Sequence, residues 1–201
     1  MTYTEDFDER AATWDDDPVK KERAAAVAAG IRAMVALSPD MRALEYGCGT
    51  GLLSFELRHE LGPITLADRS EGMLAVLKEK IHASGANNMV PVSLDLAVDP
   101  IPDERYDIVY MMMAFHHVED TDAMLRAFSR LLGSSGHLCI ADLDAEDGSF
   151  HGEGFTGHHG FDRDDLERQV RDAGFRTVEF QTVYRVVRDG AEYPVFLMAA
   201  D

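Results

Sequence analysis

The sequence predicts an α/β fold in which helices cover both faces of a mostly parallel sheet. Short apolar runs typical of buried strands alternate along the chain with longer segments whose apolar residues recur at helical spacing. The chain has 201 residues, which is long enough to bury a sizeable core. At roughly 150 residues per domain, this length predicts a single domain.

The N-terminal residues 1–38 are expected to form a cap segment followed by a helix. Residues 1–17 contain seven Asp or Glu residues and one Arg, so they are interpreted as an acidic lead-in. Its last three residues, the aspartates 15–17, are interpreted as capping the following helix and as exposed to solvent. Asp17-Pro18 is a helix start, because Asp accepts a bond from a free backbone N–H and Pro loses no needed donor there. Apolar residues at helical spacing, including Val27 and Ile31, extend this helix to about residue 37.

Seven strands are predicted from short apolar runs bounded by turn residues. The run 106–113 is the most apolar of them and is expected to be central in the sheet. The last two strands are joined by Asp189-Gly190, which is a hairpin signal, so the sheet is expected to end in an antiparallel pair. The predicted strands cover residues 41–46, 63–67, 89–94, 106–113, 136–142, 176–187 and 193–200.

Helices are predicted between these strands. The one after the first strand carries leucines at helical spacing over residues 53–61. Gly85 is expected to end the next helix, because glycine adopts the left-handed conformation common after a helix. Asp120 or Thr121 caps the following one, and Asp162 begins the last.

Residues 143–161 have neither a helix nor a strand pattern. They contain five glycines and three histidines, and an irregular stretch of this length is usually functional or mobile. The segment is therefore interpreted as a lid or a substrate loop. His151, His158 and His159 are candidate substrate-pocket residues within it.

The net charge of the chain limits its partners. Formal charge at pH 7 is −18, and such a surface repels phosphate backbones, so a nucleic acid is not an expected partner. A small cationic ligand remains compatible with this charge. The composition, 46% apolar and 28% charged, is typical of a soluble globular protein.

The cysteines and the length of the apolar runs indicate the cellular compartment. The longest apolar run, residues 108–115, is too short to span a bilayer, and the N-terminus lacks the apolar stretch of a secretory signal. Cys48 and Cys139 have no paired or clustered spacing, which excludes a cysteine-based zinc site. A cytoplasmic protein without membrane association is expected.

The most informative motif is LEYGCGTG, residues 44–51. It follows a predicted strand and opens a helix, a context in which glycines bring backbone N–H groups close to a ligand. Three glycines in five residues cost chain entropy, so a tight turn without a ligand is the less favoured interpretation.

The residues around this motif leave more than one ligand open. A dinucleotide site with the pattern G-x-G-x-x-G needs glycine where Leu52 stands. Asp68, at the end of the second strand, can accept both ribose hydroxyls of NAD or of another adenosine ligand. None of the four lysines completes the Tyr-x-x-x-Lys of a short-chain dehydrogenase, and Leu52 also excludes a P-loop. An NAD-dependent oxidoreductase therefore remains the alternative.

Five segments together resemble the class I S-adenosylmethionine-dependent methyltransferases, in particular their small-molecule type 11 and type 12 branch. The resemblance covers nearly the whole chain and implies a Rossmann-like, doubly wound, seven-stranded sheet with S-adenosylmethionine as cofactor. Gly-Ser-Ser-Gly at residues 133–136 departs from the family's usual Pro-Gly turn, which affects a turn and not the site. The segments are LEYGCGTG, LADRS (66–70), SLDLA (93–97), YDIVYMMMAFHHVED (106–120) and LLGSSGHLCIADLD (131–144).

The resemblance also implies a cofactor site residue by residue. Glu45 would hold the ammonium group, often through water, and Asp68 would accept the ribose hydroxyls. Asp95 would accept the adenine amino group, while the Leu96 N–H reads a ring nitrogen. The implied set is Glu45, Tyr46, Gly47, Cys48, Gly49, Gly51, Asp68, Arg69, Ser70, Met73, Asp95, Leu96, Met111, Met112 and Ala114.

The chemistry of methyl transfer makes catalytic residues harder to predict. In-line displacement of a good neutral leaving group needs alignment and water exclusion, and it needs a base only when the acceptor must lose a proton. His116 and His117, just past the fourth strand, are candidates for a base or for acceptor positioning, with packing or capping as the alternative. Trp14 is a candidate cover for the site. The histidine spacing matches no standard metal motif, so no metal site is expected.

A small-molecule acceptor is the expected substrate. Methyltransferases of exocyclic base amines resemble one another in an Asn-Pro-Pro-Tyr-like motif after the fourth strand, where this chain has MMMAFHH. The accepting atom stays open. A non-catalytic S-adenosylmethionine-binding protein also remains possible, because its binding motifs would look the same.

Overall fold

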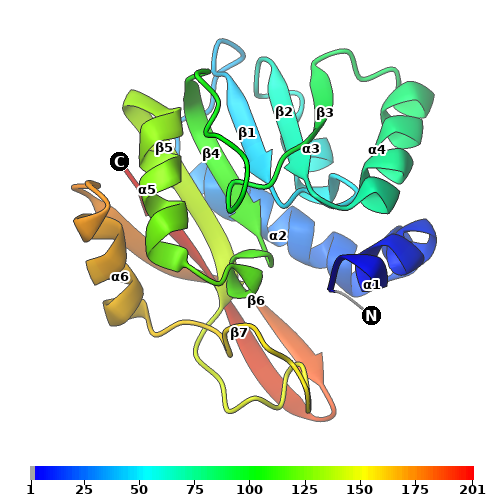
Figure 1. Ribbon diagram of the computed structural model, residues 1–201, viewed down its shortest axis with the longest axis vertical. Coiled ribbons are helices and arrows are strands. Elements are labelled where there is room, and N and C mark those ends of the chain that lie inside the picture. The colour runs from blue at the N-terminus through cyan, green and yellow to red at the C-terminus, as the bar shows by residue number, and fades with distance from the viewer. Residues whose placement is uncertain (1–2) are drawn as a thin grey trace.

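A seven-stranded sheet with the order β3-β2-β1-β4-β5-β7-β6 forms the centre of the structure (Figure 1). The computed structural model describes residues 3–201, so the first two residues of the expected cap segment lie outside it. The strands β1 to β5 are parallel, and β7 is antiparallel to both β5 and β6, which confirms the predicted antiparallel end of the sheet. The strands are β1 (Ala43–Tyr46), β2 (Ile64–Asp68), β3 (Met89–Ser93), β4 (Tyr106–Met112), β5 (Leu132–Leu143), β6 (Val178–Arg188) and β7 (Ala191–Ala200).

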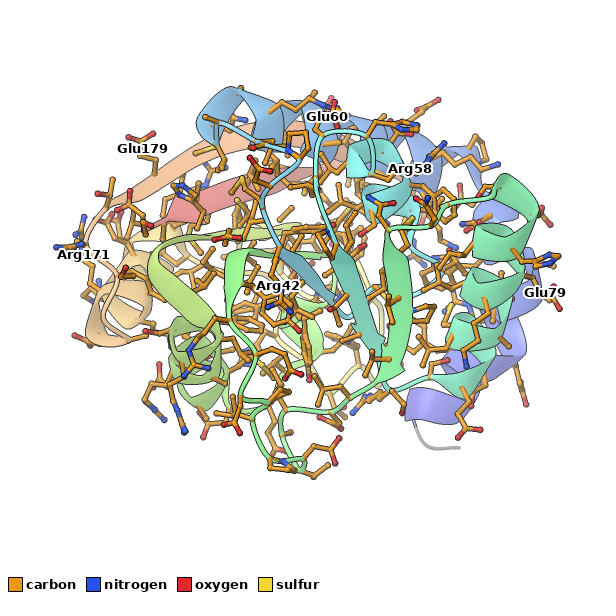
Figure 2. All side chains as sticks on the ribbon, turned by 90° about the horizontal axis from the view of Figure 1, so that it is seen from above. Arg42, Arg58, Glu60, Glu79, Arg171 and Glu179 are labelled. Carbon is orange, nitrogen blue, oxygen red and sulfur yellow. The ribbon has the colours of Figure 1, made fainter. Side chains whose placement is uncertain are left out.

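Helices cover both faces of the sheet, as predicted. Buried residues of α2, α3 and α4 form one apolar core with one face, and those of α5 and α6 form a second core with the other face. In the view of Figure 2, charged side chains such as Glu79 and Arg171 point away from these layers into solvent. The helices are α1 (Tyr3–Arg10), η1 (Ala11–Asp16), α2 (Pro18–Met34), α3 (Leu52–Leu57), α4 (Glu71–Ser84), η2 (Phe115–His117), α5 (Thr121–Leu131) and α6 (Arg163–Asp172).

The predicted end signals of the helices are confirmed. The side chains of Asp17, Asp120 and Asp162 each accept a hydrogen bond from a backbone N–H in the first turn of the helix that follows. Gly85 ends α4 in the left-handed conformation, with φ of 65°. Local sequence therefore sets these boundaries, because each cap satisfies groups that the helix itself leaves unpaired.

Two elements differ from the prediction. The helix α3 ends at Leu57, although the leucine spacing continues to Leu61. The side-chain amide of Asn88 donates to the carbonyls of Arg58, Leu61 and Gly62, and this contact from a distant segment turns the chain out of the helix. The strand β5 begins at Leu132, four residues before the predicted start, because the Gly-Ser-Ser-Gly segment joins the strand as an irregularity in the pairing with β4.

The acidic lead-in is helical in the structure, as α1 and η1, which the sequence analysis did not predict. These two short helices lie beside α4 at the edge of the molecule (Figure 1). Residues 143–161 form a long loop between β5 and α6, as predicted. The base of this loop is closed by a bridge between Asp144 and Phe161.

Candidate functional site

A cavity of about 1020 Å³ opens at the carboxyl ends of the parallel strands. It spans β1 and β4, between which the strand order reverses, and this is the place where doubly wound sheets bind ligands. The volume is at the upper end of the range for small-molecule sites, so it has room for a nucleoside-sized ligand and a second small molecule.

The glycine loop after β1 forms one wall of this cavity. Gly47, Gly49 and Gly51 all have positive φ, at 68°, 52° and 77°. A Cβ on Gly47 would lie 2.8 Å from the Ala114 Cβ, and one on Gly51 would lie 2.7 Å from the Leu77 Cδ1, so packing alone requires these two glycines. A Cβ on Gly49 would meet nothing closer than a sulfur atom at 3.9 Å, which leaves its outer side open to a ligand.

Asp68 holds the glycine loop in place. Its carboxylate accepts hydrogen bonds from the Gly49 N–H at 2.7 Å and the Ser70 N–H at 2.9 Å. Burial raises the pKa of this carboxyl group. A carboxylate offers about four acceptor positions. Asp68 can therefore keep both backbone bonds and still accept from the hydroxyls of a ribose.

Glu45 lies deeper, at the floor of the cavity, with 2% of its surface exposed. It accepts hydrogen bonds from the backbone N–H and the hydroxyl of Ser54, and that hydroxyl also lies 2.6 Å from the Tyr110 hydroxyl. Burial raises the pKa of Glu45 to about 8. At neutral pH the carboxyl therefore keeps its proton, and a cation arriving beside it would favour the ionised form.

On the adenine side of the expected cofactor site, some of the expected binding groups already form hydrogen bonds with other groups of the protein. The Leu96 N–H donates to the Tyr46 hydroxyl at 2.9 Å, so the expected contact of this N–H with a ring nitrogen requires the hydroxyl to give way. Asp95 accepts from the Ala97 N–H at 3.0 Å, and one of its oxygens lies 3.7 Å from the Arg69 guanidinium. The roles of Asp95 and Leu96 stay predictions.

The helices α1 and η1, called the N-terminal cap below, are fastened over the cavity by acidic side chains. Asp8 accepts from the Ser70 hydroxyl at 2.6 Å and from the Gly72 N–H at 2.9 Å. Asp15 accepts from the Thr50 hydroxyl and from Lys80, both at 2.5 Å. The interpretation of residues 15–17 as only capping and solvated is therefore wrong for Asp15, whose partners are distant in sequence.

Aromatic residues of the N-terminal cap face the cavity. Phe7 and Trp14 both line it, and their ring centroids lie 5.5 Å apart. The ammonium group of Lys20 lies 3.6 Å from the centre of the Trp14 ring. Trp14 thus lines the cavity that it is expected to cover, and its role as a cover stays a prediction. Nothing in the sequence indicated its lysine partner.

Arg23 is a cavity residue that the sequence analysis missed. Only 9% of its surface is exposed, and its Nε has no hydrogen-bond partner in the described part of the chain. Burial lowers the pKa of its guanidinium. The helical spacing of Arg23 with Val27 and Ile31 could have identified it, because all three are buried on one side of α2.

His116 and His117 lie where β4 ends. Met113 turns the chain there with φ of 51°, a conformation that is rare outside glycine, and η2 follows directly. The Nδ1 of His116 lies 2.7 Å from a carboxylate oxygen of Asp142, and both side chains are buried. His117 lines the cavity, whereas His116 does not.

The loop 143–161 brings His151 to the same place. Its ring centroid lies 4.8 Å from that of His116, and it stacks on Phe155 at 3.8 Å. Burial lowers the pKa of His117 to about 2 and that of His151 to about 4, so both imidazoles are neutral at pH 7.

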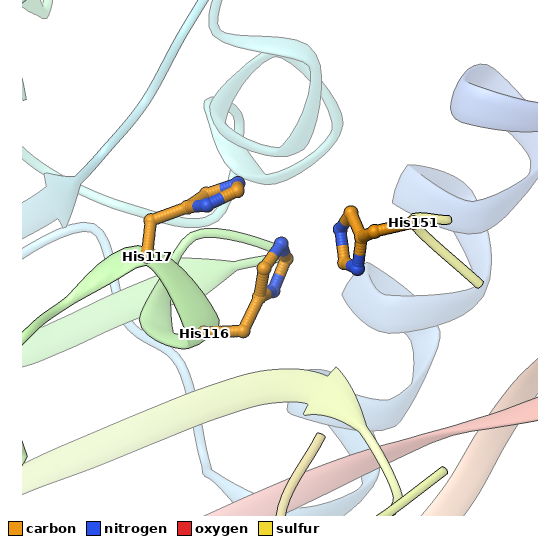
Figure 3. Close-up of side chains that lie close together, drawn as sticks. All are labelled: His116, His117 and His151. Carbon is orange, nitrogen blue, oxygen red and sulfur yellow. The ribbon is translucent and has the colours of Figure 1, made fainter. Parts of the chain in front are cut away.

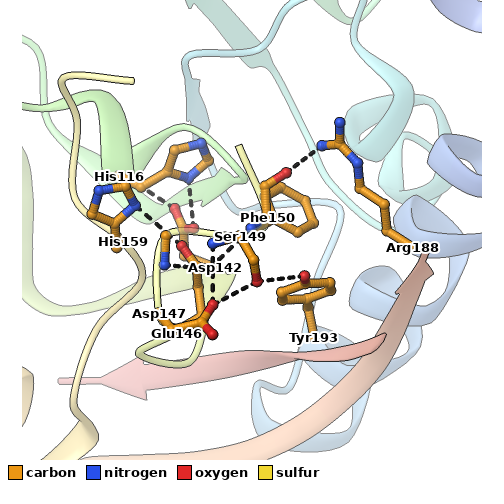
Figure 4. Close-up of polar contacts among 10 residues, drawn as sticks. His116, Asp142, Glu146, Asp147, Ser149, Phe150, His159, Arg188 and Tyr193 are labelled. Atoms are coloured by element: carbon orange, nitrogen blue, oxygen red, sulfur yellow. Dashed lines mark hydrogen bonds and ion pairs between the residues drawn. The ribbon is translucent and has the colours of Figure 1, made fainter. Parts of the chain in front are cut away.

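Internal bonds and bonds to β6 and β7 hold the loop (Figure 4). Glu146 accepts from the N–H groups of Gly148 and Phe150, the Ser149 hydroxyl lies 2.7 Å from the Tyr193 hydroxyl, and Arg188 donates to the Phe150 carbonyl. These bonds anchor the first part of the loop to itself and to the hairpin, while Phe155 and His158 in its second part line the cavity. Its role as a lid stays a prediction.

The predicted site residues fall into two groups. His158 lines the cavity and its Nε2 lies 2.9 Å from the Val118 carbonyl, whereas His159 lies outside the cavity beside Glu146. Gly51 directly precedes α3, at its N-terminal cap position, and does not line the cavity. The predicted residues that do line it are Trp14, Glu45, Tyr46, Gly47, Cys48, Gly49, Asp68, Arg69, Ser70, Met73, Asp95, Leu96, Met111, Met112, Ala114, His117 and His158.

Comparison with known proteins agrees with this geometry. A family model described as a methyltransferase domain matches residues 19–180. The ubiquinone/menaquinone biosynthesis C-methyltransferase UbiE of Shewanella sp. (strain W3-18-1) is 27% identical over 175 residues, which cover 71% of this chain and 69% of that protein.

Solved structures share the fold. A SAM-dependent methyltransferase from Aquifex aeolicus has a TM-score of 0.71 at 20% identity, covering 95% of this chain and 97% of that one. The phosphoethanolamine N-methyltransferase 2 of Haemonchus contortus, solved with S-adenosyl-L-methionine, has a TM-score of 0.68 at 16% identity, covering 82% of this chain and 49% of that one. Across residues 3–201, no helix is both long and apolar enough to cross a membrane.

The raised pKa of Glu45 predicts a pH-dependent stability. Between its ordinary value of 4.5 and about 8, the folded protein holds a proton that the unfolded chain has released. The free energy of unfolding contributed by this group therefore falls as pH rises through that window. Glu45→Gln keeps the shape without the titration, so urea unfolding at several pH values is expected to show a smaller fall in the variant.

Glu79→Gln, on the exposed side of α4, is the matched control and should unfold like the unmodified protein at every pH. Identical pH profiles for Glu45→Gln and the unmodified protein would contradict the assignment of this proton to Glu45.

Proposed function

The chain belongs to the methyltransferase-domain family and is an S-adenosylmethionine-dependent methyltransferase, and we propose that its acceptor is a small molecule bound between the N-terminal cap and His117. The observation that carries this proposal is one cavity that runs from the glycine loop to Arg23 and His117. One continuous, partly open space suits a donor and a small acceptor that must meet with little water between them.

The residues present fit the cofactor. When bound, S-adenosylmethionine supplies an electrophilic methyl group on a cationic sulfur, and its transfer leaves neutral S-adenosylhomocysteine. The open side of Gly49 admits the cofactor, and the spare acceptor positions of Asp68 take the ribose hydroxyls. Glu45 faces the ammonium end and loses its proton as that cation approaches.

The N-terminal cap excludes water from this space. Phe7 and Trp14 cover the cavity with apolar rings, while Asp8 and Asp15 fasten the cap to both turns that border the site. Water exclusion and alignment are the main contributions a protein makes to methyl transfer from a sulfonium.

The acceptor is proposed to carry a negatively charged group. Arg23 presents a buried guanidinium to the cavity, and its Nε has no hydrogen-bond partner among the described residues. Lys20 lines the same wall. The carboxylates of Asp142 and Asp17 favour the charged guanidinium but do not offset its burial, which still lowers its pKa. An anion beside it would add to this compensation, so a carboxylate or phosphate on the acceptor fits here. The names of the compared proteins, a quinone-pathway and a phosphoethanolamine methyltransferase, support an acceptor of small size.

His117 is proposed to position the acceptor and not to remove its proton. With a pKa of about 2 it is neutral but too weak a base for efficient proton removal at neutral pH. His116 is hydrogen-bonded to Asp142 and does not line the cavity. A base is not needed where the accepting atom carries a lone pair and no proton must leave in the transfer step.

A cytoplasmic location and the absence of a nucleic-acid partner are also proposed. Cys48 and Cys139 are both free and buried, which suits a reducing compartment. The charge of −18 disfavours polynucleotides.

Thermal-shift titration tests the cofactor against its competitor. S-adenosylmethionine and S-adenosylhomocysteine are expected to raise the melting temperature, with about 2.7 kcal/mol of stabilisation at 100 times the dissociation constant, and NADH is expected to have no effect. A shift with NADH alone would contradict the assignment of S-adenosylmethionine to this cavity and favour a nicotinamide cofactor. A second assay measures the transfer of labelled methyl groups from S-adenosylmethionine to small anionic acceptors. An enzyme would label an acceptor, whereas a non-catalytic binder would label none.

Asp68→Asn is expected to weaken binding of S-adenosylmethionine by about 1–3 kcal/mol, because the ribose hydroxyls lose a charged acceptor. Isothermal titration calorimetry measures this loss, with Asp103→Asn, an exposed loop aspartate, as the control. Equal affinities in the two variants would remove Asp68 from the cofactor site.

Arg23→Met keeps much of the apolar stem and removes the charge. For methyl acceptors tested in pairs with and without a carboxylate or phosphate, we expect the KM of the charged member to rise at least roughly tenfold, about 1.4 kcal/mol, while the neutral member is unaffected. Lys21→Met, two residues away on the exposed side of α2, serves as the matched control. An equal change for both members of a pair would show that Arg23 does not recognise the anion.

A further inference from the structure

Three histidines from two distant segments meet beside the cavity. His116 and His117 come from η2 and His151 from the loop 143–161. One ring nitrogen of each residue lies within 4.8 Å of the corresponding nitrogens of the other two. Figure 3 shows nitrogen atoms of all three rings facing the space between them.

The arrangement of the adjacent pair is unusual. Consecutive residues in a 3₁₀ turn project about 120° apart, so neighbouring side chains normally diverge. The rings of His116 and His117 nevertheless lie 3.9 Å apart between centroids. The fold thus directs both imidazoles to one place, to which His151 adds a third.

His116 is held in the orientation that a metal ligand needs. The two carboxylate oxygens of Asp142 accept from the His116 ring, the His116 N–H and the Leu143 N–H, at 2.7, 3.1 and 2.8 Å. A carboxylate only accepts, so Nδ1 of His116 carries the hydrogen of this bond, and Nε2 is the ring nitrogen left to face an ion. A buried carboxylate behind a histidine is the usual support of a metal-binding imidazole.

His151 contributes a buried ring nitrogen without a hydrogen-bond partner among residues 3–201. Its Nδ1 is buried and has no hydrogen-bond partner in the described part of the chain. The ring packs between aromatic side chains. It stacks on Phe155, and its centroid lies 4.8 Å from that of the Phe150 ring in an edge-on arrangement. A partly buried imidazole packed between aromatic rings, with a buried nitrogen unsatisfied, indicates that a partner from outside the chain completes it.

We propose that His116, His117 and His151 bind a divalent transition-metal ion, for which Zn²⁺ is the best fit. Three imidazoles suit zinc among the common ions, and a fourth tetrahedral position would remain open. Tetrahedral coordination at bonds of about 2.0–2.1 Å places the nitrogens about 3.3 Å apart. The most widely separated of these nitrogens must therefore approach each other by up to about 1.5 Å, through small shifts of η2 and of the loop that carries His151.

The open position would face the cavity, because His117 lines it. An oxygen, nitrogen or sulfur atom of the acceptor would complete the coordination there, and this consequence rests on the proposed function. The metal site itself does not depend on that function, since all three ligands and Asp142 belong to this chain. Arg23 and the metal would then hold an anionic acceptor from two sides.

The experiment measures metal binding by the full, tag-free chain after treatment with a chelator. Equilibrium dialysis with Zn²⁺ alone is expected to give one ion per chain, and Co²⁺ in its place should show the visible absorption of a tetrahedral site. His151→Ala is expected to lower the affinity at least roughly 100-fold, and Asp142→Asn about 10- to 100-fold through the orientation of His116. His59→Ala, an exposed histidine outside the cluster, should bind like the unmodified protein.

Three outcomes would overturn the proposal. These are binding no tighter than about 100 µM, equal affinities for His151→Ala and His59→Ala, or octahedral Co²⁺ spectra. If His151→Ala does not fold, His151→Asn replaces it, with circular dichroism as the check on both. No cofactor or acceptor is present in this assay, so its failure leaves the methyltransferase proposal intact, and the converse also holds.

Discussion

The carboxylate of Asp68 connects the two backbone turns between which the cavity opens. By accepting from Gly49 on one turn and Ser70 on the other, it fixes the wall against which a ligand lies. The N-terminal cap is then built onto the same two turns, through Asp8 to Ser70 and Asp15 to Thr50. Three acidic side chains thus join the two turns and the N-terminal cap around one cavity, because each accepts from backbone or hydroxyl donors of these turns.

The charges around that space are distributed unevenly. Asp68 and Asp95 lie on the side of the glycine loop together with Arg69, while Lys20 and Arg23 lie on the side of α2, and Glu119 and Asp120 line the cavity after η2. Although its net charge is −18, the chain therefore places two cations beside the proposed acceptor position. This arrangement supports the proposal of a cationic donor at one end and an anionic acceptor at the other, since each end would attract the opposite charge.

The loop 143–161 contributes to the site through its own hydrogen bonds. Glu146 accepts from the N–H groups of Gly148 and Phe150 within the loop, and the Ser149 and Tyr193 hydroxyls join the loop to the antiparallel hairpin. The hairpin therefore provides the surface on which the segment that carries His151 rests.

The sequence by itself determined the strand and helix order, the caps at Asp17, Asp120 and Asp162, the glycine loop and the acidic residue after β2, because these depend on local patterns and short spacings. Tertiary structure decided what depends on contacts between distant segments. Asn88 ends α3 from 27 residues beyond Leu61, Asp15 reaches Thr50, and Arg23 becomes a cavity residue once α2 packs on the sheet. The meeting of His151 with His116 is of the same kind. No spacing motif encodes it, since it is produced by the closure of a long loop around a strand end.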